Sequence, residues 1–286
     1  MKHLEFFGFS EDPFRLTPDR DFFFPSREHT AMAEAVRFGL NQGDGFIVVL
    51  GEVGTGKTML LRILMSEIGD KFVTALLLSP QLTPRQLVQS ILCDVGFEER
   101  QLIRATLDRL LRALNDYLFK LAERNKRLLV VVDEAQDLND DSIEQLRLLS
   151  NFESDKSKWL QIILFGQPEL EEKLARPHLR QLRQRIGIIE TLTPLSEDET
   201  GLYVNYRFSR AGRSDMRLDP DARRALYNHT GGIPRLINKT MGRALLLACA
   251  GGGSLRKKEI REAAGSLRLK PQNGLGANMR RIFTRP

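Results

Sequence analysis

The chain has 286 residues, of which 42% are hydrophobic and 28% charged, which is ordinary for a soluble globular protein and sufficient for one large or two medium-sized domains. No apolar run approaches the ~18 residues that span a bilayer, the acidic residues among the first aromatics exclude a signal peptide, and two distant cysteines exclude a disulfide framework. The net charge is +6, but residues 255–286 alone carry +7, so the excess of positive charge lies in the C-terminal tail. This tail either binds nucleic acid or anionic lipid, or it is simply a solvated chain end.

The first 40 residues are rich in aromatic side chains and are interrupted by prolines. The aromatics are Phe6, Phe7, Phe9, Phe14 and Phe22 to Phe24, and the prolines at 13, 18 and 25 exclude a long helix. We expect residues 1–40 to pack these rings on the core of the domain that follows. A helix should begin at Ser26 or Arg27 and run to about Asn41.

A phosphate-binding loop is predicted at residues 51–58, directly after a short apolar strand at 46–50. The sequence reads Gly51-Glu52-Val53-Gly54-Thr55-Gly56-Lys57-Thr58, and a helical stretch begins at Met59. Its glycines let backbone N–H groups turn toward phosphate oxygens, and the helix N-terminus adds a favourable dipole. Lys57 is expected to reach the β- and γ-phosphates, and the Thr58 hydroxyl to hold Mg²⁺. Residues 51–59 are therefore predicted to bind a nucleoside triphosphate.

Apolar strands and helices alternate up to residue 194. Strand-like runs lie at 46–50, 73–78, 128–132, 160–165 and 186–192, with helical patterns at 85–95, 103–124 and 142–152 between them. Strands that are apolar throughout and separated by helices predict a buried parallel sheet with helices on both faces. We therefore assign residues 41–194 to one α/β domain with five strands.

The strand at 128–132 ends in a pair of carboxylates, Asp133 and Glu134. At the carboxyl end of a parallel strand, Asp133 can bind Mg²⁺ through water, and Glu134 can orient and polarise a water for attack on the γ-phosphate. This pair favours nucleotide hydrolysis over transfer to an acceptor. The alternative is that Asp133 caps a turn and Glu134 is surface charge.

Three further polar residues follow in the same domain. Gln167 comes after the next strand, where an amide can donate to phosphate and accept from water, or it is simply a turn residue before a helix. Arg185, and second to it Arg183, precede the last strand and are candidates for a guanidinium supplied to another subunit's nucleotide. A solvated basic helix face is the alternative for both arginines.

After Pro194 the pattern becomes helical. Helices are predicted at 197–210, 220–228, 234–250 and 257–264, which make a small helical lid domain over 195–265, and residues 266–286 form a basic, flexible tail. Arg235 falls in the first turn of a helix that Pro234 opens, where a cation is unfavourable. A nucleotide phosphate would compensate, and an ion pair with a nearby acid is the alternative.

With these residues placed, the chain resembles the AAA+ ATPases over about residues 25–250. The motifs correspond to Walker A (51–58), Walker B (128–134), sensor 1 (Gln167), the arginine finger (Arg185) and sensor 2 (Arg235). More closely, the chain is similar to the general secretion pathway protein A family, or ExeA type. That similarity rests on the segments 6–9 and 13–14, on Ser26 with His29, on Asp133-Glu134-Ala135-Gln136 and on Gly166-Gln167-Pro168-Glu169-Leu170.

The resemblance implies a cytoplasmic ATPase that uses ATP and Mg²⁺ and supports a bacterial secretion or pilus apparatus through an envelope protein partner. It implies a homo-oligomeric ring or partial ring, often a hexamer, and places His29 near the adenine, although His29 alone could equally be a surface residue. Larger family members continue into a membrane span, which this sequence lacks, so we expect any attachment at the inner membrane to come from a partner or from the tail. A DNA-associated ATPase of the transposition or initiator type, and a scaffold that seldom turns over, remain alternatives.

Overall fold

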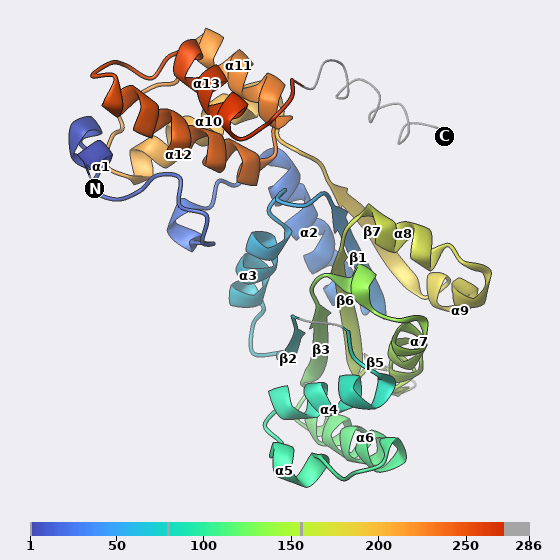
Figure 1. Cartoon of the computed structure of the whole chain (residues 1–286). Helices are drawn as coiled ribbons and strands as arrows, with labels where there is room; N and C mark the ends of the chain where they lie inside the picture. Colours follow the sequence, from blue (N-terminus) through green and yellow to red (C-terminus); the bar gives the residue numbers. More distant parts are fainter. Residues whose placement is uncertain (1, 79–80, 155–156, 272–286) are drawn as a thin grey trace. The chain divides into compact units, whose positions relative to one another are not determined.

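The computed structural model describes residues 2–78, 81–154 and 157–271 (Figure 1). These residues fall into two compact units. The sheet unit comprises residues 28–53 and 60–192, and the helical unit comprises residues 2–27, 54–59 and 193–271.

The sheet unit is built on five parallel strands in the order β2-β3-β6-β1-β7. The strands are β1 (Phe46–Gly51), β2 (Phe72–Leu77), β3 (Arg127–Val132), β6 (Leu160–Gly166) and β7 (Ile186–Leu192). The three central strands are almost entirely buried, whereas the edge strands β2 and β7 are partly exposed. The predicted five-stranded parallel sheet is confirmed, with every strand within one residue of its expected bounds.

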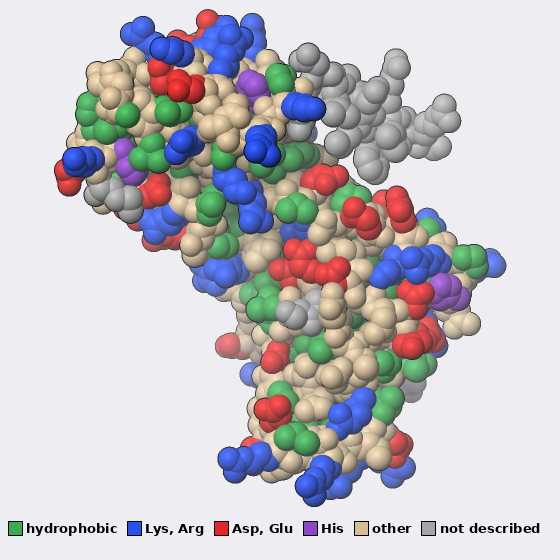
Figure 2. Space-filling model, viewed as in Figure 1, with side chains coloured by type: hydrophobic (Ala, Val, Ile, Leu, Met, Phe, Trp, Pro, Cys, Tyr) green, Lys and Arg blue, Asp and Glu red, His purple; other side chains and the backbone are tan. Residues whose placement is uncertain are grey.

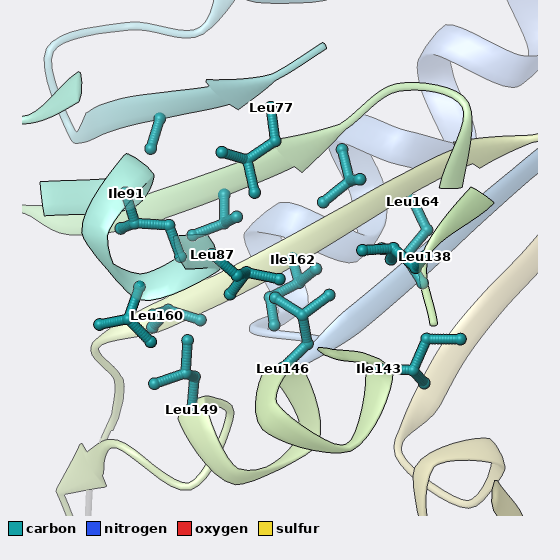
Figure 3. Close-up of a cluster of buried hydrophobic side chains, with 14 of the residues drawn as sticks. Leu77, Leu87, Ile91, Leu138, Ile143, Leu146, Leu149, Leu160, Ile162 and Leu164 are labelled. Atoms are coloured by element: carbon teal, nitrogen blue, oxygen red, sulfur yellow. The ribbon is translucent and has the colours of Figure 1, made fainter. Parts of the chain in front are cut away.

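Helices cover both faces of this sheet because successive strand residues point to opposite sides. On one face lie α4 (Pro84–Asp94), α6 (Leu107–Glu123) and α7 (Asp140–Leu149), and on the other α2 (Arg27–Gln42) and α3 (Lys57–Glu67). Figure 3 shows the first of these layers, in which Leu87 of α4 and Leu146 of α7 point toward Ile162 of β6.

Several elements of the sheet unit differ from the expected ones, among them α7, which was expected over 142–152 and spans Asp140–Leu149. The helix expected over 103–124 is α6, which begins only at Leu107 because the Thr106 hydroxyl accepts the N–H of Arg109 and so caps the helix there. A separate short helix, α5 (Glu99–Leu102), precedes it. A short antiparallel pair, β4 (Glu153–Ser154) and β5 (Ser157–Lys158), precedes β6. After β6 come α8 (Pro168–Leu174), a 3-10 turn η3 (Pro177–Leu179) and α9 (Arg180–Arg183).

The helical unit contains α10 (Glu197–Arg210), α11 (Pro220–Thr230), α12 (Pro234–Ala250) and α13 (Lys257–Ser266). The bounds of α10 and α12 are those predicted, because a Ser196 capping box opens α10 and Pro234 opens α12. The short α1 (Lys2–Phe7) lies beside α12 in Figure 1, and a 3-10 turn η1 spans Arg20–Phe22.

The N-terminal aromatics complete the core of the helical unit. Phe7, Phe9, Phe14 and Phe22 are buried in one cluster with residues of α10 to α13, among them Phe208, which stacks on Phe9 at 5.6 Å. We expected these rings to pack on the core of the α/β domain, and the structure differs. The physical reason is that the apolar faces of α10 to α13 are buried in one cluster together with these rings.

The end of the chain is described only as far as residue 271. Helix α13 runs two residues beyond its expected end, to Ser266, and most of the tail expected over 266–286 lies outside the described residues. No helix in the described part of the chain combines the length and hydrophobicity that a membrane crossing requires.

Candidate functional site

The loop after β1 has the backbone of an anion cradle. Gly54 and Gly56 have φ of +85° and +110°, which side-chain-bearing residues rarely adopt, and α3 begins at Lys57 directly behind them. The first turn of a helix has N–H groups without intrahelical partners, and these favour an anion. Thr55 and Lys57 are 1% and 6% exposed. These backbone angles and the helix start at Lys57 agree with the expected loop conformation, and phosphate binding by the segment stays a prediction.

Arg235 lies against this loop within the helical unit. Its backbone N–H donates to the carbonyl of Gly54 at 3.2 Å, and a Cβ at Gly54 would lie 2.6 Å from the Cβ of Arg235. Gly54 is thus required both by its φ and by the approach of α12. The Arg235 side chain is exposed. From the sequence we expected the guanidinium group of Arg235 to be its functional part, and the backbone contact with Gly54 was not predicted.

The carboxylate pair follows β3 at the carboxyl edge of the sheet. Asp133 is 5% exposed, and one of its oxygens, Oδ1, accepts the N–H of Glu134 at 3.0 Å. Glu134 has φ of +51°, a left-handed conformation that costs roughly 1–2 kcal/mol in a non-glycine residue. Residues held in such conformations cluster at functional sites, where the surrounding structure maintains them. The sequence carried no signal of this strain.

Gln167 and Glu134 lie together, as their placement on adjacent strands suggested. The side-chain amide of Gln167 donates to Oε2 of Glu134 at 3.3 Å. A third residue, Gln136 in the 3-10 turn η2 (Ala135–Asp137), donates to the same oxygen at 2.9 Å. Gln136 stands in the motif Asp133-Glu134-Ala135-Gln136, but nothing in the sequence indicated a role for it.

The two candidate arginines differ in their surroundings. Arg185 is half-buried and donates through Nη1 to the Ser150 hydroxyl at 3.1 Å. It also helps to lower the pKa of Glu144, although the main cause there is the hydrogen bond from Arg147. Arg183 is exposed, and it forms no ion pair within the described ranges 2–78, 81–154 and 157–271.

Arg183 also lines a shallow hollow of about 430 Å³ in the sheet unit, together with Arg176 and Arg180. Of these, Arg176 pairs with Asp140 at 3.2 Å. The hollow is rich in guanidinium groups, which suit planar or phosphate anions.

His29 lies in the first turn of α2 and is 5% exposed. The alternative that His29 is a surface residue is therefore wrong. Ser26, just before the helix, is 2% exposed. A place near the adenine stays a prediction for His29.

The donor groups of these segments fit ATP and Mg²⁺. The loop offers backbone N–H groups and Lys57 to phosphate, and Thr58 and Asp133 offer oxygen atoms, which Mg²⁺ prefers. Among the residues that the structure describes, no group of three or more His, Cys, Asp or Glu side chains could hold a metal by itself.

Residues 40–174 match the AAA domain family. The general secretion pathway protein A of Aeromonas hydrophila is 41% identical to this chain over 250 residues, which are 87% of this chain and 45% of that protein. The chain belongs to the AAA+ ATPase family. Within this family it is of the general secretion pathway protein A type, as its motifs predicted, and it spans less than half the length of that relative.

A second relative is named for Holliday junction branch migration. The Holliday junction branch migration complex subunit RuvB of Synechococcus sp. (strain CC9605) is 26% identical over 279 residues, covering 94% of this chain and 72% of that protein.

Among solved structures, the Aeropyrum pernix ORC2 protein in its ADPNP-ADP complexes matches with a TM-score of 0.63 at 20% identity, over 87% of this chain and 72% of that one. The Thermotoga maritima RuvB branch migration motor gives 0.56 at 17% identity, over 86% and 70%. At these identities the structures support the AAA+ fold alone.

Proposed function

We propose that this chain hydrolyses ATP with Mg²⁺ at residues 51–59, 133–134 and 167. The observation that carries the proposal is the Glu134 carboxylate at the end of β3, with two amides on one of its oxygens, in a chain whose loop 51–58 has the backbone of an anion cradle. Membership of an ATPase family supports the same reaction.

Each residue has a separate role in this proposal. Lys57 and the backbone N–H groups around it hold the β- and γ-phosphates, and Thr58 and Asp133 hold Mg²⁺, which when bound neutralises phosphate charge. Glu134 takes a proton from water as the water oxygen bonds to the γ-phosphorus and the bond to the β-phosphate oxygen breaks. The products are ADP and inorganic phosphate, and the proton on Glu134 passes to solvent.

Phosphate release from MgATP tests this reaction. The Lys57→Ala variant should lose ATP binding, because the phosphates lose a charge-assisted partner. The exposed Lys71→Ala variant is the matched control and should bind and hydrolyse ATP like the wild type. A wild-type protein that releases no phosphate would contradict the proposal, and so would a Lys57→Ala variant that retains full turnover.

The proposal extends to a homo-oligomeric ring, partial or hexameric, in which an arginine of one subunit serves the nucleotide of the next. Exposure and the lack of an ion pair within the described residues favour Arg183, while the bond of Arg185 to Ser150 favours a structural role for that residue. A trans arginine contributes roughly 10³–10⁵ in rate. Arg183→Ala should therefore bind ATP and fail to hydrolyse it, with Arg185→Ala as its comparison.

Mixing variants tests the trans arrangement. Arg183→Ala mixed with Lys57→Ala should recover part of the turnover, because some interfaces then join an intact loop to an intact arginine. Absence of any recovery, in mixtures that co-assemble by light scattering, would argue against the ring.

The biological role follows from the relative of highest identity given above. We propose that ATP turnover supports assembly or operation of a secretion or pilus-type apparatus of the bacterial envelope, through a protein partner and at the cytoplasmic side of the inner membrane. A strain without the gene should lose the secreted or surface-displayed proteins, and Glu134→Gln should fail to restore them. Restoration by Glu134→Gln would favour a scaffold that seldom turns over.

A DNA-associated role is the second candidate, and one surface favours it. On and around α13, Arg256, Lys258, Arg261, Arg268 and Lys270 are exposed, and Figure 2 shows many Lys and Arg side chains on the helical unit. Binding to duplex DNA in the presence of ATP should weaken steeply with salt if these side chains contact phosphates. No binding at low salt would remove this candidate.

A further inference from the structure

Gln136 lies where two neighbouring strands end. It follows Glu134 by two residues in η2, after β3, and it reaches Gln167, the residue after β6. Strands β3 and β6 are paired side by side, with Val132 opposite Leu164. The Gln136 side chain therefore bridges the ends of the two strands that carry the proposed base and its neighbouring amide.

The chemistry of its partners fixes the orientation of the Gln136 amide. Its Oε1 accepts the backbone N–H of Gln167 at 3.1 Å, and its Nε2 donates to Oε2 of Glu134 at 2.9 Å. A backbone N–H can only donate and an ionised carboxylate can only accept, so the amide cannot be reversed without losing both bonds. The Gln136 side chain thus holds Glu134 in one defined direction.

This network occupies only one oxygen of the Glu134 carboxylate. Both amide donors, from Gln136 and Gln167, go to Oε2, and Oε1 has no partner among the described residues. Two donors on one oxygen restrict rotation of the carboxylate plane. The other oxygen is then set in a fixed direction, where it can accept a proton from water.

The turn that carries Gln136 is itself anchored. Lys173 of α8 donates to the backbone carbonyls of Gln136 and Leu138, at 2.7 and 2.5 Å. A Cβ at Gly166 would lie 2.6 Å from Cδ2 of Leu170 and 3.3 Å from Oε1 of Gln136, so a larger residue there would displace the Leu170 side chain and crowd the Gln136 amide. These contacts fix the backbone that carries Gln136.

We propose that Gln136 is a positioning residue for ATP hydrolysis, holding the Glu134 carboxylate so that Oε1 accepts the proton of the attacking water. This inference rests on the proposed hydrolysis. Gln136 does not touch the reacting atoms and acts through Glu134. Its loss should therefore change the rate of the chemical step and leave nucleotide binding intact.

The first test is Gln136→Met, which keeps the length of the side chain and removes both bonds. We expect kcat to fall roughly 10- to 100-fold, because misplacement of a catalytic group by about 1 Å has that effect, with KM and ATP binding within about twofold of wild type. Gln161→Met is the matched control. Gln161 is buried and bridges Arg127 and the Asp44 carbonyl in the same sheet, so it should lower stability without changing kcat.

A double-mutant cycle with Glu134→Gln separates positioning from a structural role. If Gln136 acts through Glu134, Gln136→Met should have no further effect on kcat in the Glu134→Gln background. An equal loss in both backgrounds would overturn the proposal, as would wild-type kcat in Gln136→Met. A wild-type protein without turnover would instead overturn the proposed hydrolysis itself.

Gln136→Glu keeps the inference testable if the methionine variant does not fold. It retains the size of the side chain and the acceptor for the Gln167 N–H, but it places a second carboxylate beside Glu134. We expect a folded protein that binds ATP with a kcat at least about tenfold below wild type. Wild-type kcat in this variant would contradict the role of Gln136.

Discussion

The two units each contain a cluster of hydrogen-bonded polar side chains, and the two clusters differ in what surrounds them. In the sheet unit, Glu134, Gln136 and Gln167 meet at the carboxyl edge of the strands, where all three are partly exposed. Both amide donors contact one oxygen of the Glu134 carboxylate, and the other oxygen has no partner among the described residues. A cluster of this kind can take part in a reaction because it remains accessible to water.

In the helical unit, the charged group is buried beside aromatic rings. Arg207 is 6% exposed, its guanidinium lies 4.9 Å from the ring centre of Phe22, and it donates to the Tyr203 hydroxyl at 2.9 Å. It also donates to the carbonyl of Pro13, and no carboxylate in the described part of the chain pairs with it. This cluster joins the N-terminal segment to α10. The two clusters therefore differ more in solvent accessibility than in residue type, and only the sheet cluster is accessible enough for the proposed reaction.

Of the three substitutions, Glu134→Gln should have the largest effect, and it should change ATP hydrolysis without changing stability. Turnover should fall roughly 10²- to 10⁴-fold because the proton acceptor is lost, while the free energy of unfolding changes by about 0.5 kcal/mol or less. Phosphate release and urea unfolding measure the two quantities. Glu123→Gln, an exposed carboxylate on α6, is the control. A large loss of stability in Glu134→Gln would show that the sheet cluster also has a structural role, and the proposed difference between the two clusters would then be wrong.

Arg207→Ala should have the opposite profile. It leaves the Tyr203 hydroxyl and the Pro13 carbonyl without their donor and removes a cation from the face of Phe22, so we expect a loss of roughly 2–4 kcal/mol in unfolding free energy. Arg210→Ala on the same helix is the control, since Arg210 is 3.9 Å from Asp21 and exposed, and should cost less than about 0.5 kcal/mol. Equal stability of the two variants by far-UV circular dichroism in urea would refute the structural role.

Tyr203→Phe should have the smallest effect and a characteristic pH dependence. The hydroxyl bridges Arg207 and Asn238, to which it donates at 2.8 Å, so its removal should cost roughly 1–2 kcal/mol. Burial raises the pKa of Tyr203, opposed by Arg207. The folded protein therefore keeps this phenol neutral above about pH 10, where the unfolded chain ionises it.

The stability that depends on Tyr203 is thus complete below about pH 10 and is lost as pH rises above it. The difference in unfolding free energy between wild type and Tyr203→Phe should shrink between pH 9 and pH 11. A difference that stays constant over this range would show that the phenol ionises equally in both states.

Much of the fold could be predicted from sequence because its elements are marked locally. The strands are apolar runs, and Pro234 and the Ser196 capping box mark the starts of α12 and α10. No local sequence feature shows which apolar segments pack against each other in the folded protein. Phe9 and Phe14 are clearly hydrophobic, but only the folded chain shows that they pack on Phe208 of the helical unit.

The candidate site was predictable to the extent that single residues reveal their chemistry. Gly54, Lys57, Asp133 and Glu134 stand in motifs whose spacing carries physical meaning, and their roles remain predictions to be tested by the experiments above. Gln136 was missed because its partner Gln167 is 31 residues away, and an amide two positions after a carboxylate has no distinctive pattern.

The contact between Gly54 and Arg235 has a consequence for how this sequence can drift over evolutionary time. The bond runs from backbone to backbone, so the side chain at position 235 can be exchanged without breaking it, whereas any side chain at position 54 would collide with α12. Among natural variants of this protein, position 54 should remain glycine even in copies whose residue 235 has changed. A homologue that no longer binds nucleotide but keeps the helical unit should still have this glycine, because the packing of residue 54 against α12 requires it.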